Sequence, residues 1–388
     1  MRSLHVIPAV AERYGGPSRA IVDMCRALLA RGVQICVATT DADGARRLSV
    51  PLEKAIDHQG VETIFFSRQY SEAFKYSRPL ARWLRSSAQA FDVVHIHAVF
   101  SHASLAAARS ARGAGVPYIV RPLGSLAPWA MRHKPWRKRV LWQFGVRSML
   151  RDAAAIHCTS MAEERQIVSL LGPSKTAVVP LGVDWQPSRV SNANGDARIA
   201  DTWRPYVLAL GRLHPVKGLD LLIRAFLEVV RRRDCCDWRL VIAGDGDPGY
   251  VDQLKRLAAE RGGNGRVIFP GWLQGQAKEI ALQQAGFVAV PSHQESFGLT
   301  VFEALGQGVP VVVSRNIDIA DLISEAGAGW VCDLEEQALA ASLQEAIIGS
   351  GERIERGHRG RMLVESTYAW PIVAGQLEKL YRDVCDRG

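Results

Sequence analysis

The sequence predicts an α/β protein with two doubly wound units, each built on a parallel sheet with helices on both faces. Its 388 residues exceed the size at which one hydrophobic core usually keeps growing. Both halves alternate short β-rich runs with amphipathic helical stretches. Between them, residues 183–204 are polar and rich in Pro, Ser, Asn and Gly, which is typical of a linker.

Six strands are predicted in the first half, over residues 4–7, 33–39, 63–66, 93–97, 118–121 and 155–158. Gly15 and Gly16 form a loop after the first strand, and Pro17 then begins a helix that reaches about residue 31. Proline suits the first turn of a helix because its missing N–H is not needed there.

The second half restarts the pattern, with strands predicted over residues 206–210, 239–243, 266–269, 287–290 and 309–313. Helices are expected over residues 218–232, 251–261 and 302–307. Residues 370–384 have helical periodicity after the second sheet is complete. We therefore expect an N-terminal domain over residues 1–182, onto which residues 370–388 pack back, and a C-terminal domain over residues 183–369.

Ligands of such sheets bind beyond the carboxyl ends of the strands, so we expect the two sheets to face each other across a cleft that holds the active site. A basic loop, Gly211-Arg212-Leu-His-Pro-Val-Lys217-Gly218, follows the strand at 206–210. Its arginine and lysine can converge on a diphosphate, although the glycine spacing is not that of a P-loop. Taken alone, the loop is better explained by two solvated basic residues.

Two carboxylates, Glu295 and Glu303, flank the start of a helix predicted near Thr300. The spacing Thr300-x-x-Glu303 matches a capping box, in which the glutamate bonds back to the N-cap amide. Glu295 has no such structural explanation. Carboxylates beside the exposed amides of a helix N-terminus can accept sugar and ribose hydroxyls, while the amides and the helix dipole favour phosphate.

Together these motifs resemble those of the retaining GT-B glycosyltransferases of family 4, including bacterial enzymes of exopolysaccharide and lipopolysaccharide biosynthesis. Residues 295–303 look like the family's E-x7-E motif, residues 211–218 are similar to its G-R…K-G loop, and residues 243–246 (Ala-Gly-Asp-Gly) to its glycine turn. In the first half, residues 92–97 (Asp-Val-Val-His-Ile-His) resemble its D-x-x-H-x-H strand end, and Gly15-Gly16 its donor-side glycine loop. The motifs occur in the family's order across nearly the whole chain.

The resemblance implies a role for each matching residue. Glu303 would bind the ribose hydroxyls, and Arg212 and Lys217 the diphosphate. Glu295 would bind hydroxyls of the donor sugar, and His97 would touch that sugar from the opposite domain, near the acceptor. His95 shares a strand face with His97 and fits a satisfied core residue better. The other donor-site residues, several of which would act through the backbone, are Gly15, Gly16, Gly244, Gly271, Trp272, Leu273, Phe297, Gly298 and Leu299.

The same resemblance implies a hexosyltransferase that retains anomeric configuration and needs neither a metal nor a cofactor, since the nucleotide sugar is a substrate. Arg212 and Lys217 would stabilise the negative charge that builds on the departing diphosphate. The leaving phosphate would accept the proton of the acceptor hydroxyl in a front-face attack, so no protein nucleophile is required. Glu295 is therefore not expected to act as a glycosidase-type nucleophile.

Charge is unevenly distributed along the chain. The net charge is +9, but residues 1–180 carry +13 and residues 181–388 carry −4. The first half is therefore expected to face something anionic: nucleic acid, a phospholipid surface or a phosphorylated substrate. We favour a lipid-diphosphate or polysaccharide acceptor at an anionic membrane surface, with Arg121 near that acceptor.

The cations concentrate in residues 128–151, which can form a basic, tryptophan-rich amphipathic helix suited to an anionic membrane surface. An ordinary helix that packs Leu141 and Phe144 inward is an equal alternative. The residues assigned to membrane contact are Trp136, Arg137, Lys138, Arg139 and Trp142.

Seven cysteines without C-x-x-C spacing argue against a disulfide framework or a zinc site and indicate a reducing compartment. The first residues lack the pattern of a signal peptide, and no apolar run approaches 18 residues. These features predict a cytoplasmic protein, peripheral on the inner face of the cytoplasmic membrane.

Other functions remain open at this point. A hydrolysing sugar-nucleotide epimerase shares the fold and would release free sugar without an acceptor, and a soluble small-molecule glycosyltransferase is a further alternative. A nicotinamide-dependent oxidoreductase lacks support because no strand is followed by G-x-G-x-x-G, and a nucleic-acid-binding protein lacks a recognised motif. The donor is not determined, so UDP- and GDP-sugars are both possible.

Overall fold

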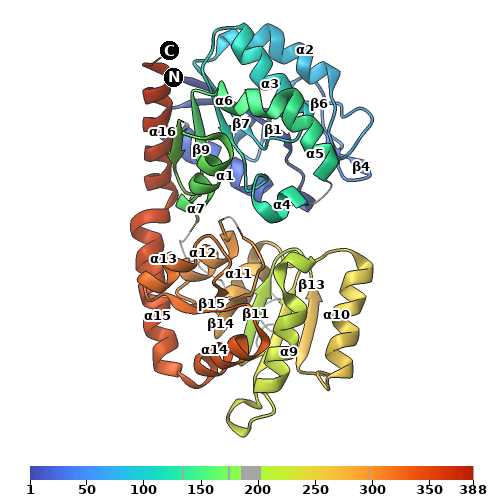
Figure 1. Cartoon of the computed structure of the whole chain (residues 1–388), viewed down its shortest axis with the longest axis vertical. Coiled ribbons are helices and arrows are strands. Elements are labelled where there is room, and N and C mark those ends of the chain that lie inside the picture. The colour runs from blue at the N-terminus through green and yellow to red at the C-terminus, as the bar shows by residue number, and fades with distance from the viewer. Residues whose placement is uncertain (133–134, 174, 185–201, 296, 388) are drawn as a thin grey trace. The chain divides into compact units, whose positions relative to one another are not determined.

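The computed structural model describes residues 1–132, 135–173, 175–184, 202–295 and 297–387. These residues form two compact units (Figure 1). Unit 1 comprises residues 1–182 together with 370–388, and unit 2 comprises residues 183–369. Most of the predicted linker, and Ser296 between the two glutamates, lie outside the described residues.

Unit 1 contains an eight-stranded sheet with the order β10-β9-β8-β7-β1-β2-β6-β5. Its neighbouring strands are parallel except for β5 and β6, which form an antiparallel hairpin. All six predicted strands are confirmed, whereas the short β5 and β10 were not predicted. The strands of this sheet are β1 Arg2–Ala9, β2 Gln34–Thr40, β5 Ala55–His58, β6 Val61–Phe66, β7 Val93–His97, β8 Tyr118–Arg121, β9 Ala155–Cys158 and β10 Thr176–Val178.

Serine caps begin three of the helices in unit 1. The hydroxyls of Ser77, Ser101 and Ser160 accept from the amides three residues later, which satisfies a donor that the first helical turn leaves unpaired. The first helix instead follows Gly15, with a proline in its first turn, as predicted. The helices are α1 Gly16–Leu29, α2 Arg78–Ser87, α3 His102–Gly113, α4 Pro128–Arg132, α5 Pro135–Leu141, α6 Arg147–Arg151, α7 Met161–Leu171 and α16 Trp370–Cys385.

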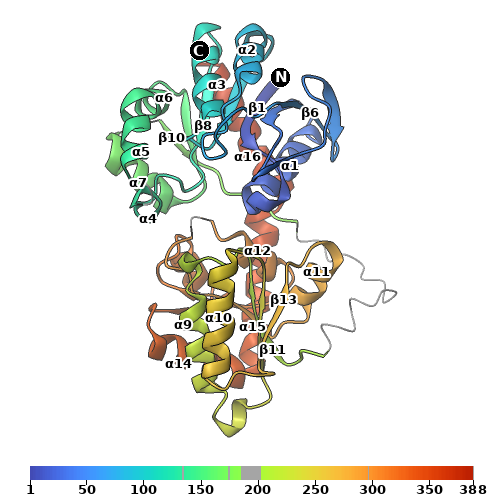
Figure 2. The ribbon, with the colours of Figure 1, turned by 90° about the vertical axis from the view of Figure 1, so that its right-hand side faces the viewer.

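The alternation of side chains along each strand sorts the sheet of unit 1 into two different faces. One face packs apolar residues, such as Val94, Ile96 and Val120, against α2, α3 and α6. On the other side, α16 lies against α1 and β7 (Figure 2). That side carries polar residues of the strands, among them His5, His95 and His97.

Unit 2 has a six-stranded, fully parallel sheet with the order β13-β12-β11-β14-β15-β16. The five predicted strands are confirmed, and β16 at the edge was not predicted. The strands are β11 Tyr206–Leu210, β12 Arg239–Ala243, β13 Val267–Gly271, β14 Phe287–Val290, β15 Val311–Ser314 and β16 Gly329–Cys332.

Helices cover the sheet of unit 2, and α9, α10 and α14 contribute buried side chains to an apolar cluster with its strands. The helices are α9 Leu219–Val229, α10 Pro248–Glu260, α11 Gly275–Gln283, α12 Leu299–Gly306, α13 Ala320–Glu325, α14 Glu336–Ile348 and α15 Ser350–Leu363. In the part of the chain that the structure describes, no helix combines the length and the apolar character needed to span a bilayer.

Candidate functional site

The strand order of unit 2 reverses between β11 and β14, which lie side by side although β12 and β13 come between them in sequence. In open parallel sheets such a reversal leaves a crevice at the carboxyl ends of the strands, where ligands bind. The loop after β11, residues 211–218, and the loop after β14, residues 291–298, flank this point. They contain the basic loop and the first carboxylate of the sequence motifs.

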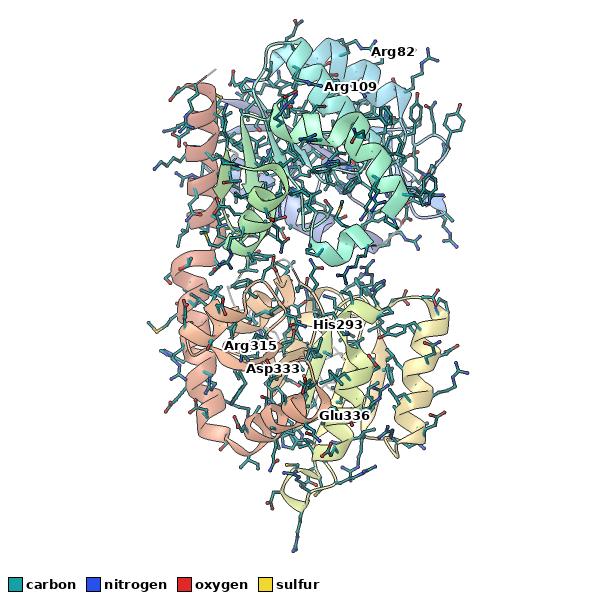
Figure 3. All side chains as sticks on the ribbon, viewed as in Figure 1. Arg82, Arg109, His293, Arg315, Asp333 and Glu336 are labelled. Atoms are coloured by element: carbon teal, nitrogen blue, oxygen red, sulfur yellow. The ribbon has the colours of Figure 1, made fainter. Side chains whose placement is uncertain are left out.

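The two loops are fastened to each other through the backbone. The amide of His293 (Figure 3) donates to the Val216 carbonyl over 2.8 Å. Gly218 closes the first loop with φ +61°, and a Cβ at this position would lie 2.2 Å from the Pro291 carbonyl oxygen. Only glycine fits this approach, so the loops hold a fixed spacing for the side chains that they carry.

The loops after β12 and β13 join the same edge of the sheet. The Gly211 amide donates to the Ala243 carbonyl over 3.0 Å, and the Gly244 amide donates to the Gly271 carbonyl over 2.8 Å. A Cβ on Gly244 would lie 1.8 Å from the Gly211 carbonyl oxygen, so the turn requires glycine. Trp272, which directly follows Gly271, is 43% exposed. Its ring is therefore available to a ligand at this edge.

Lys217 lies at the end of the first loop, and its ammonium donates to the Glu295 carboxylate. The two side chains are half-buried, at 25% and 23% exposure. The backbone of Glu295 is held in turn by the Asp318 amide, which donates to its carbonyl over 3.0 Å. A lysine and a carboxylate that belong to separate sequence motifs thus lie in direct contact, while Arg212 is exposed at the start of the same loop.

Glu303 does not form the capping box that the sequence suggested. Helix α12 begins at Leu299, with Gly298 as its N-cap at φ +69° and without a side-chain cap. Thr300 therefore lies inside the helix. The Glu303 carboxylate instead accepts from the Lys278 ammonium of α11, which lies 2.7 Å from each oxygen.

Lys278 is a functional candidate that sequence reasoning missed. It lies in the middle of α11, where a lysine is ordinary, and nothing in its spacing distinguishes it. Both side chains of the Lys278–Glu303 pair are 15% exposed. The pair therefore holds the Glu303 side chain in one orientation on α12.

The aromatic residue of the motif serves as an anchor. Phe297 is buried, and its ring stacks on that of Phe302 with centroids 4.6 Å apart. Tyr368 lies beyond Phe302, with centroids 4.2 Å apart. Because the Phe297 side chain is committed to the core, its backbone and the first amides of α12, from Leu299 onwards, are the groups that can face a ligand.

A surface hollow of about 460 Å³ adjoins the same loops, and its lining includes Pro215, Asp220, Tyr250 and His293. Most of the lining comes from α9 and α10. Lys217, Glu295 and Glu303 are not among the lining residues. We therefore place the chemistry at the loops and not in the hollow.

In unit 1 the strand order reverses between β1 and β7. The loop after β1 carries Gly15, whose φ of +75° favours glycine, and Gly16, which begins α1. The strand β7 ends at His97, and the next residue, Ala98, has φ +69°. This conformation is rare for alanine and costs about 1 kcal/mol or more, as is common at functional sites.

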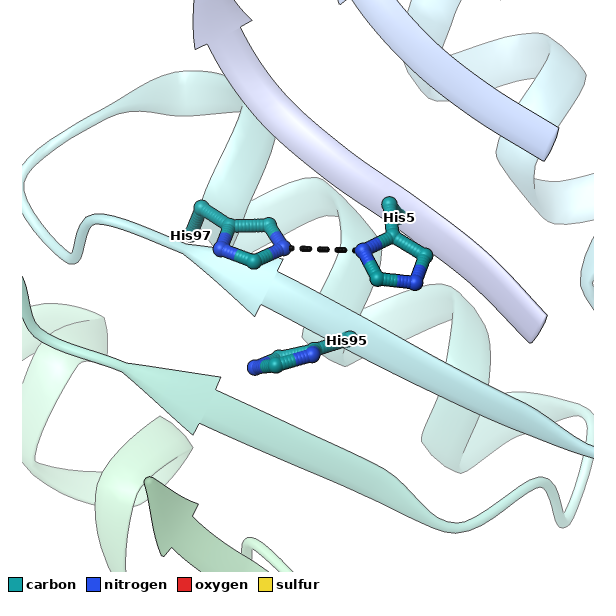
Figure 4. A group of neighbouring side chains, drawn as sticks. All are labelled: His5, His95 and His97. Atoms are coloured by element: carbon teal, nitrogen blue, oxygen red, sulfur yellow. Dashed lines mark hydrogen bonds between the residues drawn. The ribbon is translucent and has the colours of Figure 1, made fainter. Parts of the chain in front are cut away.

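His97 and His95 are both buried, at 1% and 0% exposure. They lie beside His5 of β1 and His157 of β9, which are also buried. His97 Nε2 lies 3.2 Å from His5 Nδ1 (Figure 4). Burial, together with the nearby Arg121 charge, lowers the pKa of His5 and of His157 to about 3. These imidazoles are therefore neutral at physiological pH.

Arg121 pairs in register with His97 at the end of β8 and is 1% exposed. Among the described residues its Nε and Nη2 have no hydrogen-bond partner, and its Nη1 lies 3.9 Å from the Met24 sulfur. Burial lowers its pKa to about 10, so the guanidinium still carries its charge at neutral pH. The sequence predicted contact between Arg121 and the acceptor, and the structure places this side chain inside unit 1.

Nitrogen atoms of His5, His95 and His97 lie within 4.8 Å of one another, which is compatible with a shared metal ion. The three imidazoles, however, are already engaged in hydrogen bonds with Tyr381, with His157 or with one another. The charge of Arg121 would also repel a cation. The hydrogen-bonded arrangement accounts better for these side chains, and we assign no metal to them.

The basic segment, residues 128–151, contains α4, α5 and α6, and its residues 133–134 lie outside the described part of the chain. A π-helical turn over Trp142–Val146 joins α5 to α6. Trp136, Val140 and Phe144 are 66%, 49% and 76% exposed. Their spacing of four residues puts them along one side of the helix, apart from the irregularity of the π turn. We call these three residues the apolar stripe. Phe144, which the packed-helix alternative placed inward, is on the surface.

The other residues assigned to membrane contact divide into two groups. Arg137 and Arg139 are exposed. Lys138 is half-buried, donates to the Ala130 carbonyl over 2.5 Å and lies over the Phe100 ring. Trp142 packs against the core of unit 1. Lys138 and Trp142 thus support the helix, while the two arginines accompany the apolar stripe.

Two family models match the chain, one in each half. The model described as "Glycosyl transferase 4-like domain" matches residues 15–182, and the model described as "Glycosyl transferases group 1" matches residues 196–361. The two matches cover the segments that carry the sequence motifs of both halves.

Curated relatives are similar to the chain at moderate identity. A D-inositol 3-phosphate glycosyltransferase of Nocardia farcinica is 30% identical over 250 residues, which cover 62% of this chain and 54% of that protein. A GDP-mannose:cellobiosyl-diphosphopolyprenol alpha-mannosyltransferase of Xanthomonas oryzae pv. oryzae is 26% identical over 390 residues, which cover 99% of this chain and 97% of that protein. The match thus spans about half the length of the first relative and nearly all of the second.

Solved structures are similar over the whole chain. The sucrose-phosphate synthase of Thermosynechococcus elongatus has a TM-score of 0.79 at 19% identity and covers 100% of both chains. HepE of Anabaena, solved in complex with UDP-glucose, has a TM-score of 0.79 at 19% identity over 99% of this chain and 100% of that one. At this identity the similarity concerns the fold alone.

Proposed function

Because the chain belongs to the group 1, family 4-type glycosyltransferases and has the GT-B fold, we propose that it transfers a hexosyl unit from a UDP- or GDP-sugar to a lipid-linked or growing surface-polysaccharide acceptor, with retention of anomeric configuration. The observation that carries the proposal is the contact between Lys217 and Glu295 at the strand reversal of unit 2. A cation suited to a diphosphate meets a carboxylate suited to sugar hydroxyls, where such sheets bind ligands.

The chemistry of each side chain indicates which part of the nucleotide sugar it binds. The Lys217 ammonium has three N–H donors, so it can hold a diphosphate oxygen and keep its contact with Glu295. Arg212, exposed at the start of the same loop, adds a planar fork for the diphosphate. The first amides of α12 add donors of their own. Glu303, oriented by Lys278, accepts the ribose hydroxyls.

The transfer step needs no protein nucleophile. The bond between the anomeric carbon and the diphosphate breaks, and Lys217 and Arg212 stabilise the negative charge that develops on the leaving oxygen. The acceptor hydroxyl attacks the same face, forms the new glycosidic bond and passes its proton to the leaving phosphate. This reaction retains configuration and uses the two protein cations where other enzymes use a metal ion.

The acceptor and the membrane position are proposed from the charge and the exposed apolar residues of unit 1. The charge of residues 1–180 is +13, and the apolar stripe of α5 and the following π turn is exposed beside Arg137 and Arg139. Together these features suit an anionic bilayer. The name of the Xanthomonas relative describes a diphosphopolyprenol acceptor, which is a lipid diphosphate. We therefore propose a peripheral position on the inner face of the cytoplasmic membrane.

The function is tested by incubating the full chain with a panel of UDP- and GDP-sugars and a synthetic polyprenyl-diphosphate-linked oligosaccharide. We expect acceptor-dependent release of the nucleoside diphosphate, a product with the anomeric configuration of the donor, and unchanged rates in excess EDTA. Release of free sugar without an acceptor would favour hydrolysis, and loss of turnover with EDTA would contradict the metal-free mechanism.

Membrane attachment is tested with the double variant Arg137→Gln/Arg139→Gln. Each arginine near an anionic surface contributes about 1 kcal/mol, so binding to phosphatidylglycerol-containing vesicles should weaken about 30-fold in a sedimentation assay. Lys138 is left in place because it supports the helix. The matched control is Arg82→Gln/Arg109→Gln, which removes two exposed charges from α2 and α3 of the same unit (Figure 3). If both double variants bind vesicles equally weakly, the attraction depends on the net charge of the protein and not on the surface that carries Arg137 and Arg139.

The role of Glu303 is tested by Glu303→Ala. If its carboxylate holds the ribose, KM for the donor should rise about 10-fold or more, because a buried charge-assisted hydrogen bond contributes about 1.5–3 kcal/mol. The control is Lys278→Ala, which breaks the same ion pair but leaves the carboxylate. A Glu303→Ala variant that loses thermal stability as Lys278→Ala does, but keeps its KM, would assign the pair to structure alone.

A further inference from the structure

A chain of hydrogen bonds crosses the buried face of unit 1. It begins at the Val179 carbonyl oxygen, which lies 2.7 Å from His157 Nε2. His157 Nδ1 lies 3.2 Å from His95 Nε2. The other nitrogen of His95, Nδ1, lies 2.7 Å from the Tyr381 hydroxyl, which α16 brings onto the sheet. His157 and Tyr381, which are 224 positions apart in sequence, therefore share one network.

The chain continues from the phenol to the end of β7. The Tyr381 hydroxyl lies 3.4 Å from His5 Nε2, which is the longest of these contacts. His5 Nδ1 lies 3.2 Å from His97 Nε2 (Figure 4). Among the described residues, the remaining nitrogen of His97, Nδ1, is buried without a partner. We call this set, from Val179 to His97, the histidine relay.

The carbonyl at one end fixes the direction of every bond, because it can only accept. His157 must donate from Nε2, so its Nδ1 is a lone pair in the neutral ring and accepts from His95 Nε2–H. His95 Nδ1 is then a lone pair and accepts the Tyr381 O–H. The phenol oxygen accepts from His5 Nε2–H, which leaves His5 Nδ1 to accept from His97 Nε2–H. One proton on each of the four imidazoles, together with the phenol O–H, satisfies all five contacts.

We propose that the histidine relay fixes His97 as the neutral tautomer with its proton on Nε2, so that its Nδ1 accepts a hydrogen bond from a hydroxyl group of the sugar substrate. His5, His95, His157 and Tyr381 are positioning residues in this arrangement. The inference rests on the proposed function, because a sugar supplies the hydroxyl. It adds that His97 is the acceptor in its hydrogen bond with the sugar, and it names the residues that fix the tautomer of His97.

The surroundings of the relay keep its rings uncharged. The positive charge of Arg121 of β8 lowers the pKa of all four rings. The buried carboxylate of Glu163 of α7, which accepts from the Thr159 and Gly124 amides, acts on Arg121. Cys25 of α1 and Tyr381 of α16 face the same region and stay neutral, since burial raises the pKa of both. A doubly protonated imidazole would have no lone pair to accept the next hydrogen bond, and burial opposes such protonation.

An unpartnered lone pair is the feature that points to a ligand. A buried acceptor without a donor is costly, and native proteins rarely leave one unless a water or a ligand fills the position. The strained Ala98 directly after His97 is a second sign of a functional position. A hydroxyl donor suits Nδ1, whereas a phosphate or carboxylate oxygen offers no proton to it.

The direct test is nitrogen-15 NMR of histidine-labelled full-length protein, in which long-range proton correlations separate the two tautomers. We expect His97 to show a protonated Nε2 and an unprotonated Nδ1 throughout pH 6–8. In Tyr381→Phe, His5 loses the acceptor for its Nε2–H, so His97 should show a mixture of tautomers. Protonated Nδ1 in the wild type, or an unmixed His97 in Tyr381→Phe, would overturn the relay.

Kinetics give the second readout. If the Nδ1 contact is lost in the minor tautomer, Tyr381→Phe should lower kcat/KM about fivefold with the natural donor, and Kd for the nucleoside diphosphate alone should not change. A deoxy donor that lacks the contacted hydroxyl should be insensitive to Tyr381→Phe. The matched control is Tyr118→Phe, a buried tyrosine whose hydroxyl donates to the Met149 carbonyl over 2.9 Å outside the relay.

These results separate the two proposals. Loss of transfer in the wild type with every donor would refute the proposed function, whatever the tautomer. If the wild type transfers sugar, but Tyr381→Phe lowers kcat/KM by the same factor with the normal and the deoxy donor, the relay alone is refuted.

Discussion

Replacing Lys217 with alanine is expected to lower kcat about 10²–10³-fold, because it removes the cation that meets the leaving diphosphate. Lys217 lies at the strand reversal of unit 2 and contacts Glu295. The donor keeps its contacts with Arg212, Glu303 and the start of α12, so its binding should weaken less than turnover does. The measurement is a steady-state assay of nucleoside diphosphate release with the best donor of the panel.

Two variants sharpen this prediction. Arg315→Ala removes one cation and one ion pair, with Asp333 at 3.0 Å, from an exposed part of the same unit (Figure 3). It should leave turnover unchanged. Glu295→Gln keeps the lysine but removes the charge that it contacts. Near-normal turnover of Lys217→Ala, or an equal loss in all three variants, would contradict the role of Lys217 at the diphosphate.

Unit 1 is expected to lose stability steeply as the pH falls below 6.5. His5 and His157 have pKa values lowered from 6.5 to about 3 in the folded protein, chiefly by burial. The unfolded chain therefore binds more protons below pH 6.5, so the stability is present above that pH and is lost as the pH falls toward 3. Each ring contributes about 1.4 kcal/mol per pH unit, or about 4 kcal/mol for the two rings at pH 5.

His95 and His97 act in the same direction, since burial lowers the pKa of both well below 6.5. Since domains are stable by only about 5–15 kcal/mol, unit 1 should open between pH 4 and 5. Hydrogen exchange, corrected for intrinsic rates, should then show loss of protection in β1, β7 and β8 before β11 and β12. The described residues of unit 2 include no buried histidine.

The proton uptake on unfolding provides the control. At pH 5 it should fall by about one proton in His157→Gln, because one ring that charges only when unfolded is gone. The comparison is His293→Gln, which removes an exposed histidine from unit 2 (Figure 3). Equal protection of both sheets at pH 4.5 would show that the four buried rings are not the sensitive element.

Local patterns predicted most of the strands, whereas several helices, such as α2, α3 and α14, were not predicted. The buried parallel strands β7, β8, β11, β12 and β14 were predicted with the bounds that the structure has, because each is a short apolar run between clear breakers. The edge strands β5, β10 and β16, which were missed, are four residues or fewer, as are the missed strands of the small hairpin β3 Ala42–Asp43 and β4 Arg46–Arg47. Such short edge strands exist only because a neighbour supplies their hydrogen bonds, so their own sequence carries little signal.

The sequence also predicted which loops carry the candidate donor site, since its motifs follow strands whose carboxyl ends share an edge. It could not predict the partners of the two glutamates. Thr300-x-x-Glu303 has the spacing of a capping box, but the left-handed Gly298 begins α12 earlier and turns Glu303 toward Lys278. A lysine of the preceding helix competes with the local cap, and only the packing of α11 on α12 brings it within reach.

By itself, the sequence thus determined the two α/β units, the order of their strands along the chain and the residue types at the strand ends. These depend on local periodicity and on turn chemistry. The tertiary structure decided which of those residues meet: Lys217 with Glu295, Lys278 with Glu303, and His97 with His5. It also decided that Tyr381 meets His5, and that His157 meets the Val179 carbonyl directly after β10. Strand order and the return of α16 set these contacts, and no local pattern encodes them, because the partners lie tens to hundreds of residues apart.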